Sequence, residues 1–86
     1  MATYQILYWK ELPSQVKAHD ARGEVKAVLP DSFQEAIDRA AMKAGDVDAD
    51  AYLDGWNWSD PQEMPGTPED VLRAVVEALI AQRHPG

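Results

Sequence analysis

The chain contains no cysteine among its 86 residues. That absence excludes disulfide bonds, thiol catalysis, iron–sulfur clusters and zinc–thiolate sites. The sequence also has no apolar run long enough to cross a membrane. Residues 1–5 show no basic segment followed by an apolar one, so we expect no signal peptide. Together these absences predict a cytoplasmic protein.

Positive charge is scarce as well. Lys and Arg number 8 against 15 Asp and Glu, which gives a net charge of −7. The basic residues are scattered, so we expect no nucleic acid and no membrane surface as a partner, because both are anionic and would repel the domain. Hydrophobic residues nevertheless make up 45% of the chain, which argues against disorder. The length predicts one small α/β domain over residues 1–86.

Motifs for catalysis and ligand binding are also missing. His19 and His84 are the two histidines, and neither has neighbours that resemble a catalytic triad. The five glycines are isolated from one another and form no phosphate-binding loop. Residues 46–57 space their carboxylates like a calcium loop, but Ala51 stands where glycine is required and Asn57 where glutamate is required. We therefore predict no catalytic residue, no metal site and no cofactor.

The first third of the chain has strand patterns. Residues 3–9 are rich in aromatic and branched side chains on both faces, which predicts a central strand. Residues 11–14 predict a turn, and residues 15–20 alternate as in a half-exposed strand. Residues 24–29 resume the alternation after a turn at Gly23. The sequence leaves open whether this is a separate strand or part of a bulged one.

A first helix is expected between Pro30 and Gly45. Asp31 or Ser32 can cap its free amides, and each has a Gln or Glu three residues later, as in a capping box. Gly45 supplies the stop. The alanine-rich stripe that includes Ala41 predicts a close approach of this helix to the sheet.

A second helix is expected over residues 67–83. Thr67 is suited to the N-cap and Pro68 to the first helical position. Between the two helices, residues 51–58 are predicted to form a third strand. Residues 59–66 contain two prolines and are predicted to form a loop.

This order, strand–strand–helix–strand–helix, predicts an α/β protein of the α+β type. We expect a two-layer sandwich with a three- to four-stranded, mostly antiparallel sheet and both helices on one face, because two helices with one apolar stripe each cover a single face. The other face would then be open. Its candidate residues are Leu7, Trp9, Lys17, His19, Trp56 and Trp58.

The tryptophans are the main candidates for a functional surface. Trp56 and Trp58 lie two residues apart, so a strand would place them on the same face. Core packing is one interpretation, but Asp54 would share that face, which argues against full burial. Tryptophan is also a common interface anchor. We therefore predict Trp9, Trp56, Trp58 and Leu7 as partner-binding residues.

Several segments resemble the small bacterial proteins grouped as the "virulence factor" family of unknown function. They are residues 4–10 (YQILYWK) with 13–16 (PSQV), residues 29–30 and 33–38 (FQEAID), residues 40–42, and residues 50–53 leading to Trp56. The FQEAID run is the most specific of them. The resemblance implies no catalytic residues. It implies an association with virulence, and a link to folate- and corrinoid-dependent one-carbon metabolism.

Two functions follow as hypotheses. The first is a cytoplasmic protein-interaction module without an active site of its own, which binds a protein partner or a second copy through the open sheet face. The alternative is a small-molecule-binding or catalytic accessory protein in folate or corrinoid one-carbon metabolism. Its ligand would lie near Asp60 and Glu63, beside Trp56 and Trp58.

Overall fold

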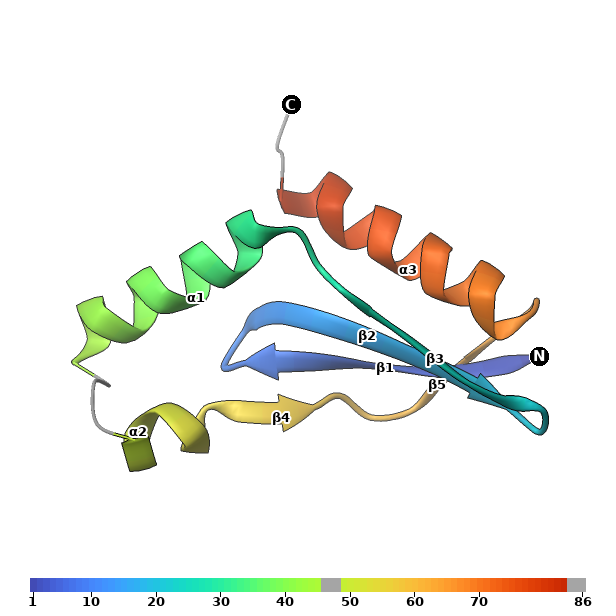
Figure 1. Ribbon diagram of the computed structural model, residues 1–86, viewed down its shortest axis with the longest axis horizontal. Helices are drawn as coiled ribbons and strands as arrows, with labels where there is room; N and C mark the ends of the chain where they lie inside the picture. The colour runs from blue at the N-terminus through green and yellow to red at the C-terminus, as the bar shows by residue number, and fades with distance from the viewer. Residues whose placement is uncertain (46–48, 84–86) are drawn as a thin grey trace.

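The computed structural model describes residues 1–45 and 49–83, which form one sheet and three helices (Figure 1). The strands and helices follow in the order β1, β2, β3, α1, α2, β4, β5, α3. Their bounds are β1 Ala2–Trp9, β2 Leu12–Asp20, β3 Gly23–Val28, α1 Asp31–Ala44, α2 Ala49–Asp54, β4 Trp56–Trp58, β5 Gln62–Met64 and α3 Pro68–Arg83. The predicted α+β fold with a mostly antiparallel sheet is confirmed, but within the described residues the sheet has five strands instead of three or four, and there are three helices instead of two.

The sheet is antiparallel throughout its described pairs and has the order β3-β2-β1-β4. β1 is central, as its apolar residues on both faces predict. Its second edge is shared by two short strands, because β4 pairs with residues 7–9 and β5 with residues 2–4. Ser59 links the two: its amide donates to the Ile6 carbonyl at 2.8 Å, and its hydroxyl accepts from the Ile6 amide at 2.9 Å.

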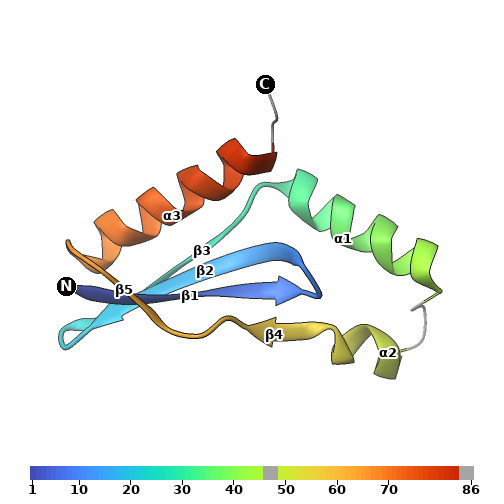
Figure 2. The same cartoon turned by 180° about the vertical axis from the view of Figure 1, so that it is seen from behind.

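The larger core cluster lies between the sheet and two helices. α1 and α3 occupy the same side of β1 and β2 and approach each other where α1 begins and α3 ends (Figures 1 and 2). The strands contribute Ile6, Val16 and Ala18 to this cluster. The helices contribute Phe33, Val71, Val75 and Leu79. The even-numbered residues of β1 and β2 therefore face the helices, since side chains alternate along a strand.

A second, smaller cluster is centred on Trp9. The side chains of Ile37 and Ala41 from α1 are buried against it, and Tyr52 of α2 packs alongside. The Trp9 indole N–H donates to the Tyr52 carbonyl at 2.8 Å. Tyr52 also lies edge-on to Trp56, with ring centroids 5.8 Å apart. This aromatic cluster fixes α2 against the end of β1.

The prediction of a strand over residues 51–58 was wrong for its first half. Residues 49–54 form α2, and strand structure begins only at Trp56. Asp54 therefore does not share a strand face with the tryptophans. The helical turn places the Tyr52 carbonyl within reach of Trp9, and this long-range hydrogen bond outweighs the weak local preference for a strand.

The segments around the other strands also differ from expectation. Residues 24–29 do form a separate strand, β3, which pairs with β2 as a hairpin. Residues 59–66 are not all loop, since they contain β5. The turn predicted over residues 11–14 is confirmed only at Glu11, which forms it with Lys10, because β2 begins at Leu12 and includes Pro13. Pro13 is tolerated there because it lies at a register shift in the β1–β2 pairing.

The helix ends follow the sequence in two of three cases. Gly45 ends α1 with a left-handed conformation, φ 78°, as predicted. The amide of Asp70 donates to the Thr67 hydroxyl at 3.1 Å, which confirms the cap of α3. The capping box predicted for Asp31 or Ser32 was wrong: within the described residues Pro30 holds the N-cap position and no side chain caps α1. Asp31 instead lies in the first turn, where the helix dipole favours a carboxylate.

Candidate interaction surface

The sheet face turned away from α1 and α3 carries three rows of side chains, which the strand registers define. The term "open face" is used below for these residues. The first row is Val28, Gln15, Leu7 and Trp58. The second is Lys26, Lys17 and Gln5. The third is Glu24, His19, Thr3 and Glu63. Within the described part of the chain, no helix packs over these rows (Figure 1).

Trp58 is the largest exposed side chain of the open face. Its exposed fraction is 38%, and it lies directly opposite half-buried Leu7 on β1. The Lys17 ammonium lies 4.2 Å from the centroid of the Trp58 ring, a cation–π contact. Val28, at the other end of the same row, is 76% exposed. The face therefore combines an aromatic ring, aliphatic groups and a positive charge that lies over the ring.

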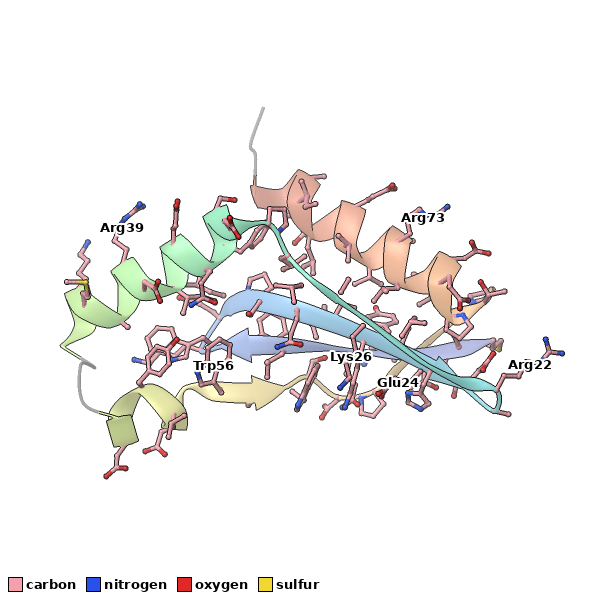
Figure 3. The ribbon with its side chains drawn as sticks, viewed as in Figure 1. Arg22, Glu24, Lys26, Arg39, Trp56 and Arg73 are labelled. Carbon is pink, nitrogen blue, oxygen red and sulfur yellow. The ribbon has the colours of Figure 1, made fainter. Side chains whose placement is uncertain are left out.

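Two lysines oppose each other on this face of an acidic protein. Lys17 and Lys26 are direct partners in the β2–β3 register. Like charges in this position destabilise a sheet. Lys26 has one carboxylate nearby, that of Glu24, at 3.8 Å, and both side chains point away from the helices (Figure 3). The opposed lysines therefore lower the stability of the sheet at this point.

Trp9 does not lie on the open face, which corrects the sequence prediction. It is 1% exposed, enclosed by α1 and α2. Alternation along β1 alone would place Trp9 beside Leu7, but side chains from α1 and α2 pack around this end of β1 and cover it. Trp56, the first residue of β4, is half-buried in the same cluster, beside α2 (Figure 3). Of the four predicted partner-binding residues, Leu7 and Trp58 are thus the two that the open face brings together.

Sequence reasoning missed Val28 and Lys26 as surface residues. The signal was present in the alternation of residues 24–29, which places Glu24, Lys26 and Val28 on one face of β3. That signal could not be used without the hairpin register, which brings these residues beside Gln15 and Lys17 of β2.

The residues predicted for a small-molecule site lie apart from the aromatic cluster. Asp60 is exposed between β4 and β5, and Glu63 is exposed on β5 opposite Thr3. Ligand binding at these residues stays a prediction. Among residues 1–45 and 49–83, no three His, Asp or Glu side chains come together as metal ligands. Asp46 and Asp48 of the calcium-like spacing lie outside the described residues, as does His84.

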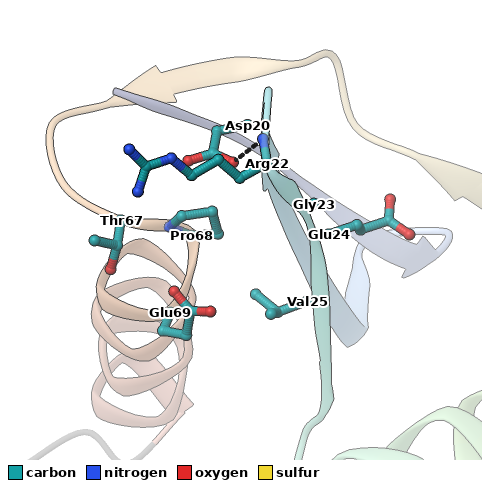
Figure 4. A pocket seen from close by; sticks show the side chains of 8 residues that line it. All are labelled: Asp20, Arg22, Gly23, Glu24, Val25, Thr67, Pro68 and Glu69. Carbon is teal, nitrogen blue, oxygen red and sulfur yellow. Dashed lines mark hydrogen bonds between the residues drawn. The ribbon is translucent and has the colours of Figure 1, made fainter.

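A hollow of about 290 Å³ lies between the β2–β3 turn and the start of α3 (Figure 4). Its lining includes Asp20, Arg22 and Glu69. Asp20 accepts a hydrogen bond from the Arg22 amide at 2.8 Å, which closes the turn. Thr67, also in the lining, caps α3. The hydrogen bonds of Asp20 and Thr67 thus stabilise a turn and a helix end, which explains both residues without a ligand.

The structure defines a small α+β domain in which the described residues form a mostly antiparallel, five-stranded sheet and three helices. Within the described residues, no helix is long and apolar enough to span a membrane. A protein-family model described as "Virulence factor" matches residues 7–84, so the chain belongs to the virulence factor family, as its sequence predicts. No curated protein and no solved structure gives a significant match to the chain.

Proposed function

We propose that this domain is a cytoplasmic protein-interaction module without an active site of its own, which supports virulence by binding a protein partner through its open face. The observation that carries the proposal is Trp58. It lies half exposed beside Leu7 and under the ammonium of Lys17, on a sheet face over which no described helix packs.

The chemistry of this surface favours a protein partner. Tryptophan and neighbouring aliphatic groups form the anchors of many interfaces, where they are buried at the centre. The contact between Lys17 and Trp58 restricts both side chains before binding, which lowers the entropy cost of association. A fitting partner would present an apolar side chain to Trp58 and a carboxylate to Lys17.

The proposal is tested with chemical cross-linking in producing cells, followed by mass spectrometry of the cross-linked proteins. Trp58→Ala removes the exposed aromatic ring of the open face. Leu53→Ser is the matched control, because Leu53 is a 62% exposed apolar residue on α2, away from the open face. We expect the wild type and Leu53→Ser to capture the same protein and Trp58→Ala to lose it. Capture of the same protein by all three forms would contradict the proposal.

Tryptophan fluorescence gives an independent readout with the purified protein. Iodide should quench Trp58 but not Trp9, because Trp9 is enclosed in the core. Binding at the open face should protect Trp58 from iodide. Light scattering in parallel shows whether the occupant is a second copy, since a dimer of this kind would lose the protection on dilution.

A further inference from the structure

We propose that the free edge of β3 pairs with β3 of a second copy, antiparallel and about a two-fold axis at Val25, so that two sheets join into one. This interface uses the backbone edge of β3, at the opposite edge of the sheet from Trp58 on β4. The pairing of β3 can therefore be tested independently of the function proposed above.

β3 is an edge strand with free hydrogen-bonding groups. In the sheet order it pairs with β2 on one side, and no described strand pairs with its other side. The Leu29 amide donates to the Ser14 carbonyl at 2.9 Å, which continues the β2–β3 register. Because backbone groups alternate in direction along an antiparallel strand, those of Glu24, Lys26 and Val28 face outward. Such an edge is a template for another strand.

Two-fold symmetry restricts the ways in which two copies of β3 can pair. A two-fold axis normal to the sheet makes the strands antiparallel and keeps both open faces on the same side. This axis must pass through one residue of β3. The position of that residue determines which side chains of the two copies lie directly opposite each other. An axis at Glu24 would place two carboxylates opposite each other, and an axis at Lys26 two ammonium groups, and both arrangements are destabilising.

An axis at Val25 gives the complementary arrangement. Glu24 of each copy then lies opposite Lys26 of the other, so that two opposite-charge pairs form by symmetry. An axis at Ala27 would instead place Lys26 opposite Val28 and bring Glu24 opposite Pro30, which has no amide hydrogen to donate. Charge and hydrogen bonding therefore favour the axis at Val25.

This arrangement also accounts for the two opposed lysines. Across the joined sheet, the row would run Lys17, Lys26, then Glu24 and His19 of the second copy. The carboxylate of the second copy thus lies opposite Lys26, on the side away from Lys17. A lysine on an edge strand can alternatively serve to prevent pairing. A lysine that prevents pairing requires no complementary charge in the second copy. The experiment below therefore distinguishes a lysine that prevents pairing from one that pairs with Glu24 of the second copy.

The experiment measures the dissociation constant by sedimentation equilibrium for the wild type, Glu24→Lys and Lys26→Glu. We expect the wild type to dimerise. Each variant alone should dimerise about tenfold more weakly or worse, because both charge pairs become like-charge pairs. An equimolar mixture of the two variants should restore dimerisation, since the two lysines on β3 of one copy then face two glutamates on β3 of the other. A wild type that stays monomeric, or a mixture that shows no recovery, would overturn the proposal.

Cross-linking tests the register. The natural chain has no cysteine, so a single introduced thiol gives an unambiguous result. Val25→Cys should form a disulfide-linked dimer under mild oxidation, because Cβ atoms of directly opposed residues lie about 5 Å apart. Ala27→Cys is the control, since its two copies would be about 13 Å apart, four residues along the strand. Preferential cross-linking of Ala27→Cys would refute the axis at Val25.

Trp58→Ala distinguishes this interface from the open face. We expect Trp58→Ala to dimerise as the wild type does, and iodide to quench Trp58 equally in monomer and dimer. If Trp58→Ala abolished the dimer while both charge variants kept it, self-association would occur through the open face, and the pairing of β3 would be refuted.

Discussion

Replacing Gly55 with alanine tests how α2 and β4 are held to the end of β1. A Cβ atom at residue 55 would lie 2.6 Å from Nε1 and 2.9 Å from Cε2 of Trp9. These distances are shorter than van der Waals contact, so the ring or the backbone would have to move. Residue 55 is therefore glycine because the indole lies directly against its backbone.

Neither partner can move at low cost. The Trp9 ring is buried against Ile37 and Ala41, and its N–H is bonded to the Tyr52 carbonyl. The Gly55 carbonyl accepts from the Lys10 amide at 2.7 Å, which fixes the glycine backbone. Overpacking of this kind costs about 1–3 kcal/mol in the free energy of unfolding. In a domain of this size, each kcal/mol lowers the melting temperature by about 4–8 °C.

Urea unfolding followed by far-ultraviolet circular dichroism measures this loss, with Gly23→Ala as the control. A Cβ at Gly23 meets no atom within 4 Å, so that variant should differ from the wild type by less than about 0.5 kcal/mol. Trp9→Phe removes the indole nitrogen, so Gly55→Ala should cost less in that background, with a coupling of about 0.5–3 kcal/mol. An unchanged midpoint for Gly55→Ala, or an equal loss for Gly23→Ala, would refute the reasoning.

Three further predictions use the same unfolding assay. Thr67→Ala should lose about 1 kcal/mol, because the threonine hydroxyl caps α3; Thr67→Ser should keep most of the stability. Ala41→Leu should lose about 1–3 kcal/mol, because Ala41 is buried against Trp9; a loss below about 0.5 kcal/mol would mean that α1 can shift. Ser59→Ala should lose about 1–3 kcal/mol, because the Ile6 amide loses its acceptor, whereas Ser59→Thr retains a hydroxyl.

Much of the fold follows from local patterns in the sequence. β1, α1 and α3 lie within a residue or two of the predicted ranges, because their apolar residues recur at one clear spacing and their ends carry strong signals such as Gly45 and Thr67. The β2–β3 hairpin was left open because alternation fits a bulged strand as well as a hairpin. The pairing of Asp20 with Gly23 decides for the hairpin.

The segment that was predicted wrongly depends on contacts between distant residues. Tyr52 and Leu53 suit a strand by local preference, yet they belong to α2. The contact that favours the helix joins Trp9 to Tyr52, 43 residues apart in the sequence. The burial of Trp9 has the same origin, since α1 and α2 cover it only after the chain has folded back on β1. Periodicity within one segment contains no information about such contacts.

The core and the open face are linked through β4, and this link determines which variants are informative. Gly55 directly precedes Trp56, so the cluster around Trp9 also positions β4 and, with it, Trp58. A change at Gly55 should therefore disturb both stability and binding. A change at Trp58 should affect mainly binding and cost only about 0.2–1 kcal/mol of stability, because Trp58 lies opposite Leu7 and under Lys17 at the surface rather than in the buried cluster. A loss of binding in Trp58→Ala, with the protein still folded and its stability lowered by no more than this amount, would thus identify the open face as a functional surface rather than an extension of the core.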